Sequence, residues 1–218
     1  PFLIREIVRI AREQNYPVSA HFMESPAEKE WLNHSKGNFT DFFLNMLNQK
    51  SSLQTPIEFL NLFKNINNLS FTHCVEANLD ELELIKTLDA SIIHCPNSNR
   101  LLNNSILNLD NIKEIPLALG TDGLSSNHTL NLFEEIKNAF YMHTKYEPEP
   151  FAKQLLHAAT VGGAKALGLK NKGVLQKGND ADIIALQLPD KPSQLATAII
   201  LHTNKTTHTF IGGKNETF

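Results

Sequence analysis

Four side chains that can bind metal ions or transfer protons occupy equivalent places along the chain. His21, His73, His94 and Asp122 each lie at, or just beyond, the end of a short apolar run that predicts a β-strand. The carboxyl ends of parallel strands meet at one edge of an α/β sheet, where binding and catalytic sites are built. One histidine on a strand is usually structural, but such groups after four consecutive strands predict a common site. The remaining histidines are interpreted as structural or solvated: His34, His128, His143, His157, His202 and His208.

A carboxylate, Glu24, follows His21 on the loop that leads into the next predicted helix. This carboxylate could act as a general acid or base in the same site. It could equally be an acidic residue stabilised by the dipole at a helix N-terminus. The spacing does not match the zinc-protease helix motif, because the paired histidines of that motif are absent.

Two polar segments also follow predicted strands directly. Residues 120–123 read Gly-Thr-Asp-Gly, and the glycines would let the backbone approach a ligand closely. Residues 94–99 read His-Cys-Pro-Asn-Ser-Asn. A loop of the site and a tight structural turn are equally compatible with this second segment.

The elements that must position these groups alternate between strands and helices. Short apolar runs predict strands at residues 18–22, 69–73, 91–94 and 117–121. Capping boxes, in which a glutamate follows the capping residue after three positions, predict helices that begin at Ser25, Thr55 and Asn78. Strands that alternate with capped helices indicate βαβ units and a parallel sheet, so the predicted fold class is α/β.

Further helices are expected, and the sequence pattern changes from helical to β-rich near the C-terminus. Apolar periodicity predicts helices at residues 2–11, 39–47, 130–143 and 151–167. After residue 168, glycines punctuate short β-rich runs at 182–188 and 206–211. We therefore predict two domains: the alternating units in residues 1–168 and a small β-rich module in residues 169–218.

Composition narrows the class of protein. With 218 residues, 41% of them hydrophobic and 20% charged, the chain can bury a sizeable core. A net charge of −3 disfavours nucleic acid as a partner. No apolar stretch approaches the about 18 residues that cross a bilayer, so no membrane association is expected. The two cysteines, Cys74 and Cys95, favour a reducing cytoplasm over a disulfide scaffold. The start at Pro1, on a helical pattern, suggests a chain entered partway.

Together, these motifs resemble the metal-dependent amidohydrolase superfamily. The resemblance rests on His21-x-x-Glu24, Thr72-His73, residues 94–99 and residues 120–123, and on two tail segments: Ala159-Thr160-x-Gly162-Gly163-Ala164 and Gly173-Val174-Leu175-x-x-Gly178-x-x-Ala181-Asp182. Within it, the most similar branch is that of aminohydrolases acting on adenosine-type nucleosides, including methylthioadenosine/adenosylhomocysteine deaminases and aminodeoxyfutalosine deaminases. Residues 24–39 most resemble the last group.

The resemblance implies the second half of a (β/α)₈ TIM-like barrel, followed by part of a small β-sandwich. His21 would end the fifth barrel strand, His73 the sixth and His94 the seventh, and Asp122 would follow the eighth. The family's first-strand His-x-His pair is absent from this sequence. A whole barrel needs about 250 residues. We therefore expect a fragment whose partners are the N-terminal half of the same protein and, in a homo-oligomer, further copies.

The resemblance also implies the chemistry. One divalent metal ion is expected, Zn²⁺ with Fe²⁺ as the alternative, and His21 and Asp122 would be two of its ligands. Glu24, His73 and Asp122 would be catalytic: Glu24 would protonate the purine ring nitrogen, His73 would hydrogen-bond the attacking hydroxide, and Asp122 would relay a proton to the departing ammonia. Substrate contacts are expected from Glu24, His94, Ser98, Asn99 and Arg100. The isolated fragment is expected to be inactive.

The expected small-molecule substrate is aminodeoxyfutalosine, deaminated to futalosine and ammonia in menaquinone biosynthesis. Methylthioadenosine or adenosylhomocysteine, a cyclic amide and a chlorinated ring are alternative substrates, and a non-catalytic scaffold is the alternative class. The aromatic residues Trp31, Phe39, Phe42 and Phe43 could form a pocket wall for an aromatic substrate group. They could as well pack the helix at 39–47 onto the barrel.

Overall fold

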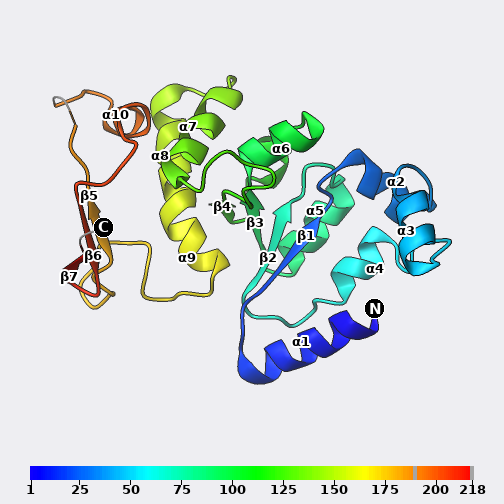
Figure 1. Ribbon diagram of the computed structural model, residues 1–218. Coiled ribbons are helices and arrows are strands. Elements are labelled where there is room, and N and C mark those ends of the chain that lie inside the picture. Colours follow the sequence, from blue (N-terminus) through cyan, green and yellow to red (C-terminus); the bar gives the residue numbers. More distant parts are fainter. Residues whose placement is uncertain (189–190, 217–218) are drawn as a thin grey trace.

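A four-stranded parallel sheet forms the centre of the computed structural model, which describes residues 1–188 and 191–216 (Figure 1). Its order is β1–β2–β3–β4, which is the order of the strands in the sequence: β1 (Val18–Phe22), β2 (Leu69–His73), β3 (Ser91–His94) and β4 (Leu117–Leu119). Because all four strands run the same way, their carboxyl ends lie at one edge. The first three strands have the predicted bounds, and the fourth is shorter than predicted.

Helices connect and cover these strands. The bounds of the first six are α1 (Phe2–Gln14), α2 (Pro26–His34), α3 (Phe39–Leu47), α4 (Pro56–Asn61), α5 (Leu79–Thr87) and α6 (Pro96–Asn103). A 3₁₀ turn (Leu109–Ile112) precedes β4, and α7 (Leu132–Met142) and α8 (Pro148–His157) follow it. A π-helical turn, η2 (Ala158–Gly162), joins α8 to α9 (Gly163–Ala166).

The predicted helix starts have identifiable causes. Ser25, Thr55 and Asn78 are the N-caps of α2, α4 and α5, and each side chain accepts the backbone N–H of a glutamate three residues on. In α4 and α5 the glutamate completes a reciprocal capping box.

Residues 96–103 form α6, so the segment after His94 is neither the open loop nor the tight turn expected. Pro96 is the first residue of this helix. Proline is compatible with that position because the first N–H of a helix has no intrahelical partner. Consequently Asn97, Ser98 and Asn99 lie on the buried first turn of a helix directly behind the end of β3.

The core lies between the sheet and its helices. Phe22, Phe71 and Ile92 come from three neighbouring strands, and Leu60 and Ile85 from α4 and α5; all five are fully buried. Burial of such side chains contributes about 1.5–3 kcal/mol each. This core holds the strands in register and so fixes the edge at which His21, His73 and His94 end.

The C-terminal part contains a second sheet and a helix. Strands β5 (Ile183–Ala185), β6 (His208–Ile211) and β7 (Lys214–Glu216) form an antiparallel sheet on the far side of α7–α9 from β1 (Figure 1). Helix α10 (Leu195–His202), which the β-rich pattern did not indicate, packs on α7 and α8. Its N-terminus is held by Glu149 of α8, whose carboxylate accepts the N–H groups of Ala196 and Thr197. A boundary at residue 168 stays a prediction.

Among residues 1–188 and 191–216, no helix combines the length and apolarity that a membrane span requires.

Candidate active site

Three of the expected site residues converge at the carboxyl edge of the large sheet. His73 Nε2 lies 3.7 Å from Glu24 Oε1 and 3.9 Å from Asp122 Oδ2. The ligand-capable atoms of these three residues all lie within 4.8 Å of one another. The His73 side chain is fully buried, and within the described residues its Nε2 has no hydrogen-bond partner. A buried, unpaired nitrogen between two carboxylates marks this cluster as the place where a ligand is needed.

The backbone at the cluster is unusual. Met23, His73, Cys74 and Asp122 have φ values of 52°, 74°, 53° and 57°, in the left-handed region that non-glycine residues seldom adopt. Each such residue costs on the order of 1–3 kcal/mol and persists only where its surroundings impose it. These residues lie where three of the four strands end, so the strain is concentrated at the candidate site.

Asp122 is held as a carboxylate by donors on three sides. Its Oδ2 accepts hydrogen bonds from Ser98 Oγ at 2.7 Å and from Ser126 Oγ at 2.9 Å, and its Oδ1 accepts one from the Gly123 N–H at 2.7 Å. Partial burial raises the pKa of Asp122, but the hydrogen bonds from Ser98, Gly123 and Ser126 outweigh it and lower that pKa below its usual value.

Glu24 is positioned through its backbone. Its N–H donates a 2.8 Å hydrogen bond to Glu28 Oε2, while the Glu28 N–H donates to Ser25 Oγ. The Glu28 carboxylate therefore accepts the N–H of Glu24, whereas in a capping box it would accept the N–H of the N-cap residue, Ser25. Burial raises the pKa of the Glu28 carboxyl. The Glu24 side chain is part-exposed and open to a ligand.

His21 lies beside the cluster and is exposed. Its ring centroid is 5.1 Å from that of His73. The structure thus brings His21 to the same edge, next to His73, but outside the tight group of Glu24, His73 and Asp122. Its role as a metal ligand stays a prediction.

The residues expected to contact substrate are placed differently. His94, Ser98 and Asn99 are fully buried behind the cluster: Ser98 donates to Asp122, and Asn99 contacts both His73 and His94. Arg100 is exposed and hydrogen-bonds Asn104 of the next turn. Substrate contact by these four residues stays a prediction.

Two buried residues near the site had no recognisable signal in the sequence. Glu135 of α7 accepts hydrogen bonds from the Asn97 N–H and from the side-chain amides of Asn97 and Asn127, and burial raises its pKa. It thereby ties α6 and the loop after Asp122 to α7. His143, interpreted above as structural or solvated, lies with its Nε2 3.2 Å from His94 Nε2. Both contacts join residues far apart in sequence, which is why local patterns missed them.

The aromatic residues pack together between α2 and α3. Trp31 stacks on Phe43 at a centroid distance of 4.7 Å, and Phe39 and Phe42 each meet Phe43 edge-on. This arrangement fixes the helix at 39–47 against α2. The aromatics thus pack this helix against α2, and both their packing onto the barrel and their contact with a substrate stay predictions.

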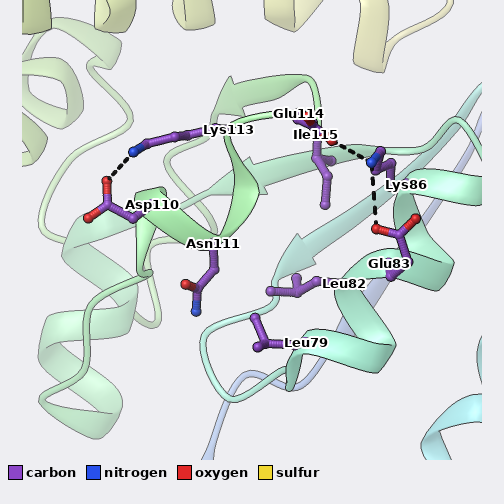
Figure 2. Close-up of a pocket in the computed structure, with 9 residues that line it drawn as sticks. All are labelled: Leu79, Leu82, Glu83, Lys86, Asp110, Asn111, Lys113, Glu114 and Ile115. Carbon is purple, nitrogen blue, oxygen red and sulfur yellow. Dashed lines mark hydrogen bonds and ion pairs between the residues drawn. The ribbon is translucent and has the colours of Figure 1, made fainter.

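A groove of about 380 Å³ lies between α5 and the segment before β4, away from the cluster (Figure 2). Its charged side chains pair with one another: Lys86 with Glu83 and Glu114, and Lys113 with Asp110. These exposed pairs satisfy each other in solvent. The Glu24–His73–Asp122 cluster is therefore the stronger candidate for chemistry.

Known proteins are similar to this chain in sequence and in fold. The model of the amidohydrolase family matches residues 1–215. This chain belongs to the amidohydrolase family. It is 44% identical over 215 residues to the aminodeoxyfutalosine deaminase of Nitratiruptor sp., covering 97% of this chain and 53% of that protein. It is 35% identical to an adenosine deaminase of Helicobacter pylori, covering 95% of this chain and 52% of that protein.

Solved structures agree on the fold. The crystal structure of Helicobacter pylori aminofutalosine deaminase in complex with methylthio-coformycin superposes with a TM-score of 0.91 at 32% identity, covering 100% of this chain and 55% of that one. An adenosine deaminase from Xanthomonas campestris with bound zinc superposes with a TM-score of 0.74 at 23% identity, over 97% of this chain and 48% of that one.

The expected fold is confirmed: the four βα units correspond to half of the eight in a TIM-like barrel, and a small antiparallel sheet follows them. The chain spans about half the length of the relatives it matches.

Proposed function

We propose that this chain supplies the fifth-to-eighth-strand side of the active site of a metal-dependent aminohydrolase that deaminates an adenosine-type nucleoside. The observation that carries the proposal is the convergence of Glu24, His73 and Asp122 around an unpaired, buried His73 Nε2. The 44% identity to an aminodeoxyfutalosine deaminase and the 35% identity to an adenosine deaminase support the reaction class.

The residues present fit a divalent metal ion. Imidazole nitrogen and carboxylate oxygen are donors that Zn²⁺ accepts, and His21 and the hydrogen-bonded Asp122 carboxylate offer both at this edge of the sheet. The unpaired Nε2 of buried His73 faces the same space and is free to hydrogen-bond a ligand there. Asp122, with His21 beside the cluster, would hold the ion together with ligands from outside this chain, and Fe²⁺ is compatible with the same donors. When bound, such an ion lowers the pKa of a coordinated water molecule toward about 7, so that hydroxide forms at neutral pH.

The chain's own residues would handle protons and orientation. Glu24, part-exposed and held by the contact of its N–H with Glu28, would protonate the purine ring nitrogen next to the amino-bearing carbon. His73, immobilised by burial, would hydrogen-bond the attacking oxygen. Asp122, a carboxylate at the start, would take the proton that the attacking oxygen loses and relay it to the departing ammonia.

The finer proposal is that the substrate is aminodeoxyfutalosine, which would place the protein in menaquinone biosynthesis. The relative at 44% identity carries that activity in its name. Methylthioadenosine is a second candidate, because the aminofutalosine deaminase of Helicobacter pylori is in complex with methylthio-coformycin, a ligand that also carries a methylthio group. Residues 1–168 would form the barrel domain and 169–218 the β-rich module. The buried free thiols of Cys74 and Cys95 support a cytoplasmic location.

Ammonia release by the intact protein tests the proposal. We expect kcat/KM for aminodeoxyfutalosine to exceed that for methylthioadenosine and adenosylhomocysteine by at least about tenfold, which is about 1.4 kcal/mol of transition-state discrimination. A preference for another nucleoside would reject the finer proposal alone. No ammonia from any purine nucleoside, in protein shown by elemental analysis to hold stoichiometric metal, would reject the reaction class and favour another amidohydrolase reaction or a scaffold.

A further inference from the structure

A row of four buried polar side chains runs from the candidate site into the molecule. His73 Nδ1 lies 2.8 Å from Asn99 Oδ1, Asn99 Nδ2 lies 3.4 Å from His94 Nδ1, and His94 Nε2 lies 3.2 Å from His143 Nε2. His73, Asn99 and His94 are fully buried, and His143 is 6% exposed. The row joins β2, α6, β3 and the end of α7. The mechanism above uses only its first member.

The chemistry of the amide fixes the direction of the hydrogen bonds. An amide oxygen can only accept, so His73 Nδ1 carries the proton that is donated to Asn99 Oδ1. An amide nitrogen can only donate, so His94 Nδ1 is the acceptor from Asn99. His94 then carries its proton on Nε2 and donates it to His143 Nε2.

Both inner histidines are neutral in this arrangement. Burial lowers the pKa of His94 to about 3 and that of His143 to about 4. Each ring therefore has one donor and one acceptor nitrogen, as the row requires. The ring of His143 packs against Phe151 and Tyr146, at centroid distances of 5.7 and 6.2 Å, which fixes its orientation.

We propose that Asn99, His94 and His143 are positioning residues that set the tautomer of His73, with the proton on Nδ1 and the lone pair of Nε2 facing Glu24 and Asp122. Because an amide does not pass protons along, Asn99 transmits orientation without connecting the site to a proton pathway. In this tautomer His73 accepts a hydrogen bond from a ligand in the cluster. The meaning of that state for catalysis rests on the proposed function; the tautomer itself does not.

The same four residues could also bond in the reverse direction. If the Asn99 amide turned over, it would donate to His73 Nδ1, and His73 would carry its proton on Nε2, pointing at the two carboxylates. In the reversed row His143 Nε2 would donate to His94 Nε2, so the proposed direction requires His143 to present its unprotonated Nε2. Without an acceptor at residue 143, the proposed direction would leave the buried N–H of His94 unpaired, and the preference for it should be lost.

Nitrogen-15 NMR of histidine-labelled intact protein, without substrate, distinguishes protonated from unprotonated ring nitrogens. In the wild type we expect His73 to be protonated at Nδ1 only. His143→Phe keeps an aromatic ring beside Phe151 but accepts no hydrogen bond, and should give a mixture of His73 tautomers. His143→Gln, which can still accept through its amide oxygen, should restore a larger Nδ1-protonated fraction than His143→Phe.

A second pair of variants tests the row at its centre. In Asn99→Asp both oxygens accept, so His73 should keep its tautomer while His94 becomes protonated at Nδ1. In Asn99→Leu the side chain at residue 99 makes no hydrogen bond, so it fixes the tautomer of neither His73 nor His94. A wild-type His73 protonated at Nε2, or a His73 spectrum unchanged in both His143→Phe and Asn99→Leu, would overturn the proposal.

Kinetics link the row to the proposed reaction. For His143→Phe we expect a fall in kcat of about tenfold or more with KM within about twofold, and recovery in His143→Gln. A merely structural role would lower thermal stability without moving the tautomer. If the tautomers behave as proposed but no variant, including the wild type, deaminates any nucleoside, the proposed function fails and the assignment of the row stands.

Discussion

Glu24 combines a part-exposed carboxylate with a rigid backbone. The side chain faces His73, and the N–H is held by Glu28. The backbone of Glu24 thus keeps one orientation, while the carboxylate of its side chain remains accessible to a ligand. This combination is the one required of a general acid, whose contribution depends on position as well as on pKa.

Replacing Glu24 by Gln is expected to lower kcat of the intact protein by about 10²–10⁴-fold, the usual contribution of a positioned general acid or base. Metal content, measured by elemental analysis, should be unchanged. Glu30→Gln changes an exposed glutamate on the same helix-containing segment and should leave kcat unchanged. Activity of Glu24→Gln near that of the control would assign Glu24 to stabilisation of the helix N-terminus.

His94 and His143 should make the fold sensitive to acid. Their pKa values are lowered by burial from 6.5 to about 3 and about 4. The pKa of each histidine is lower in the folded protein than in the unfolded chain. As the pH falls below the pKa of the unfolded chain, the unfolded chain binds a proton that the folded protein does not. The folded state therefore loses stability as the pH falls. The free energy of unfolding should therefore fall between pH 6.5 and 4, by up to about 1.4 kcal/mol per pH unit for each histidine.

Urea unfolding at pH 7, 6 and 5 measures this slope. The free energy of unfolding should depend less on pH in His143→Gln than in the wild type, by up to about 1.4 kcal/mol per pH unit. His208→Gln, which changes an exposed histidine of the small sheet, should leave the slope as it is. Parallel curves for the wild type and His143→Gln would contradict the prediction.

At the next scale, the π-helical turn η2 brings the last barrel helix unusually close to β4. A Cβ atom on Gly162 would overlap the carbonyl oxygen of Leu117, whereas a Cβ on Gly163 would have its nearest neighbour, the Ala158 carbonyl oxygen, at 3.9 Å. Since β4 leads directly to Asp122, this contact helps to fix the position of the carboxylate.

Gly162→Ala is expected to destabilise the protein by more than about 2 kcal/mol, because close-packed backbone must move, and to weaken metal binding. Gly163→Ala, one residue on, removes backbone freedom from an open helical position and should be neutral or stabilising by about 0.4–1 kcal/mol. Thermal unfolding and metal titration of the two variants compare them directly. Equal stabilities would show that the helix can withdraw from the strand at little cost.

The predicted elements and the missed ones differ in what defines them. Residues 18–22, 69–73 and 91–94 were predicted because an apolar run bounded by polar residues defines a buried strand locally. Helix α6 was missed because residues 94–99 were interpreted as a site loop or a tight turn, whereas Pro96 begins a helix. Helix α10 lay within a segment predicted to be β-rich, and its first turn is held by Glu149 of α8, 47 and 48 residues before the two N–H groups that it accepts.

The site shows the same limit. The strand-end positions of His73 and Asp122, and Glu24 beside them, could be predicted from sequence. Asn99, His94 and His143 could not be joined into a row, because their contacts depend on how α6 and α7 pack behind the sheet. Side-chain partners brought together by tertiary packing leave no periodic signal in the chain.

For the whole molecule, the large sheet is open on its β1 side. β1 pairs only with β2 among the described strands, and the neighbouring α1 exposes Leu3, Ile7 and Ile10 on one face while it buries Val8 and Ala11. An unpaired edge strand beside an apolar helix face favours association with another chain.

Produced alone, the 218-residue chain should therefore self-associate and bind Zn²⁺ weakly. Light scattering after gel filtration should show mass increasing with concentration. Ile7→Lys combined with Ile10→Glu should reduce association, while Lys214→Glu, a change at an exposed residue of β7 in the small sheet, should not. A monodisperse monomer that holds one equivalent of zinc and deaminates nucleosides would refute this prediction.

The carboxylate of Glu149 at the start of α10 has a consequence for the order in which the chain folds. An isolated helix of eight residues is not stable in water, and the N–H groups of its first turn find their acceptor on α8. Helix α10 can form only on an α8 that is already in place. The last part of the chain is thus assembled after the barrel helices. Its amides should exchange with deuterium through an opening that leaves β1–β4 protected.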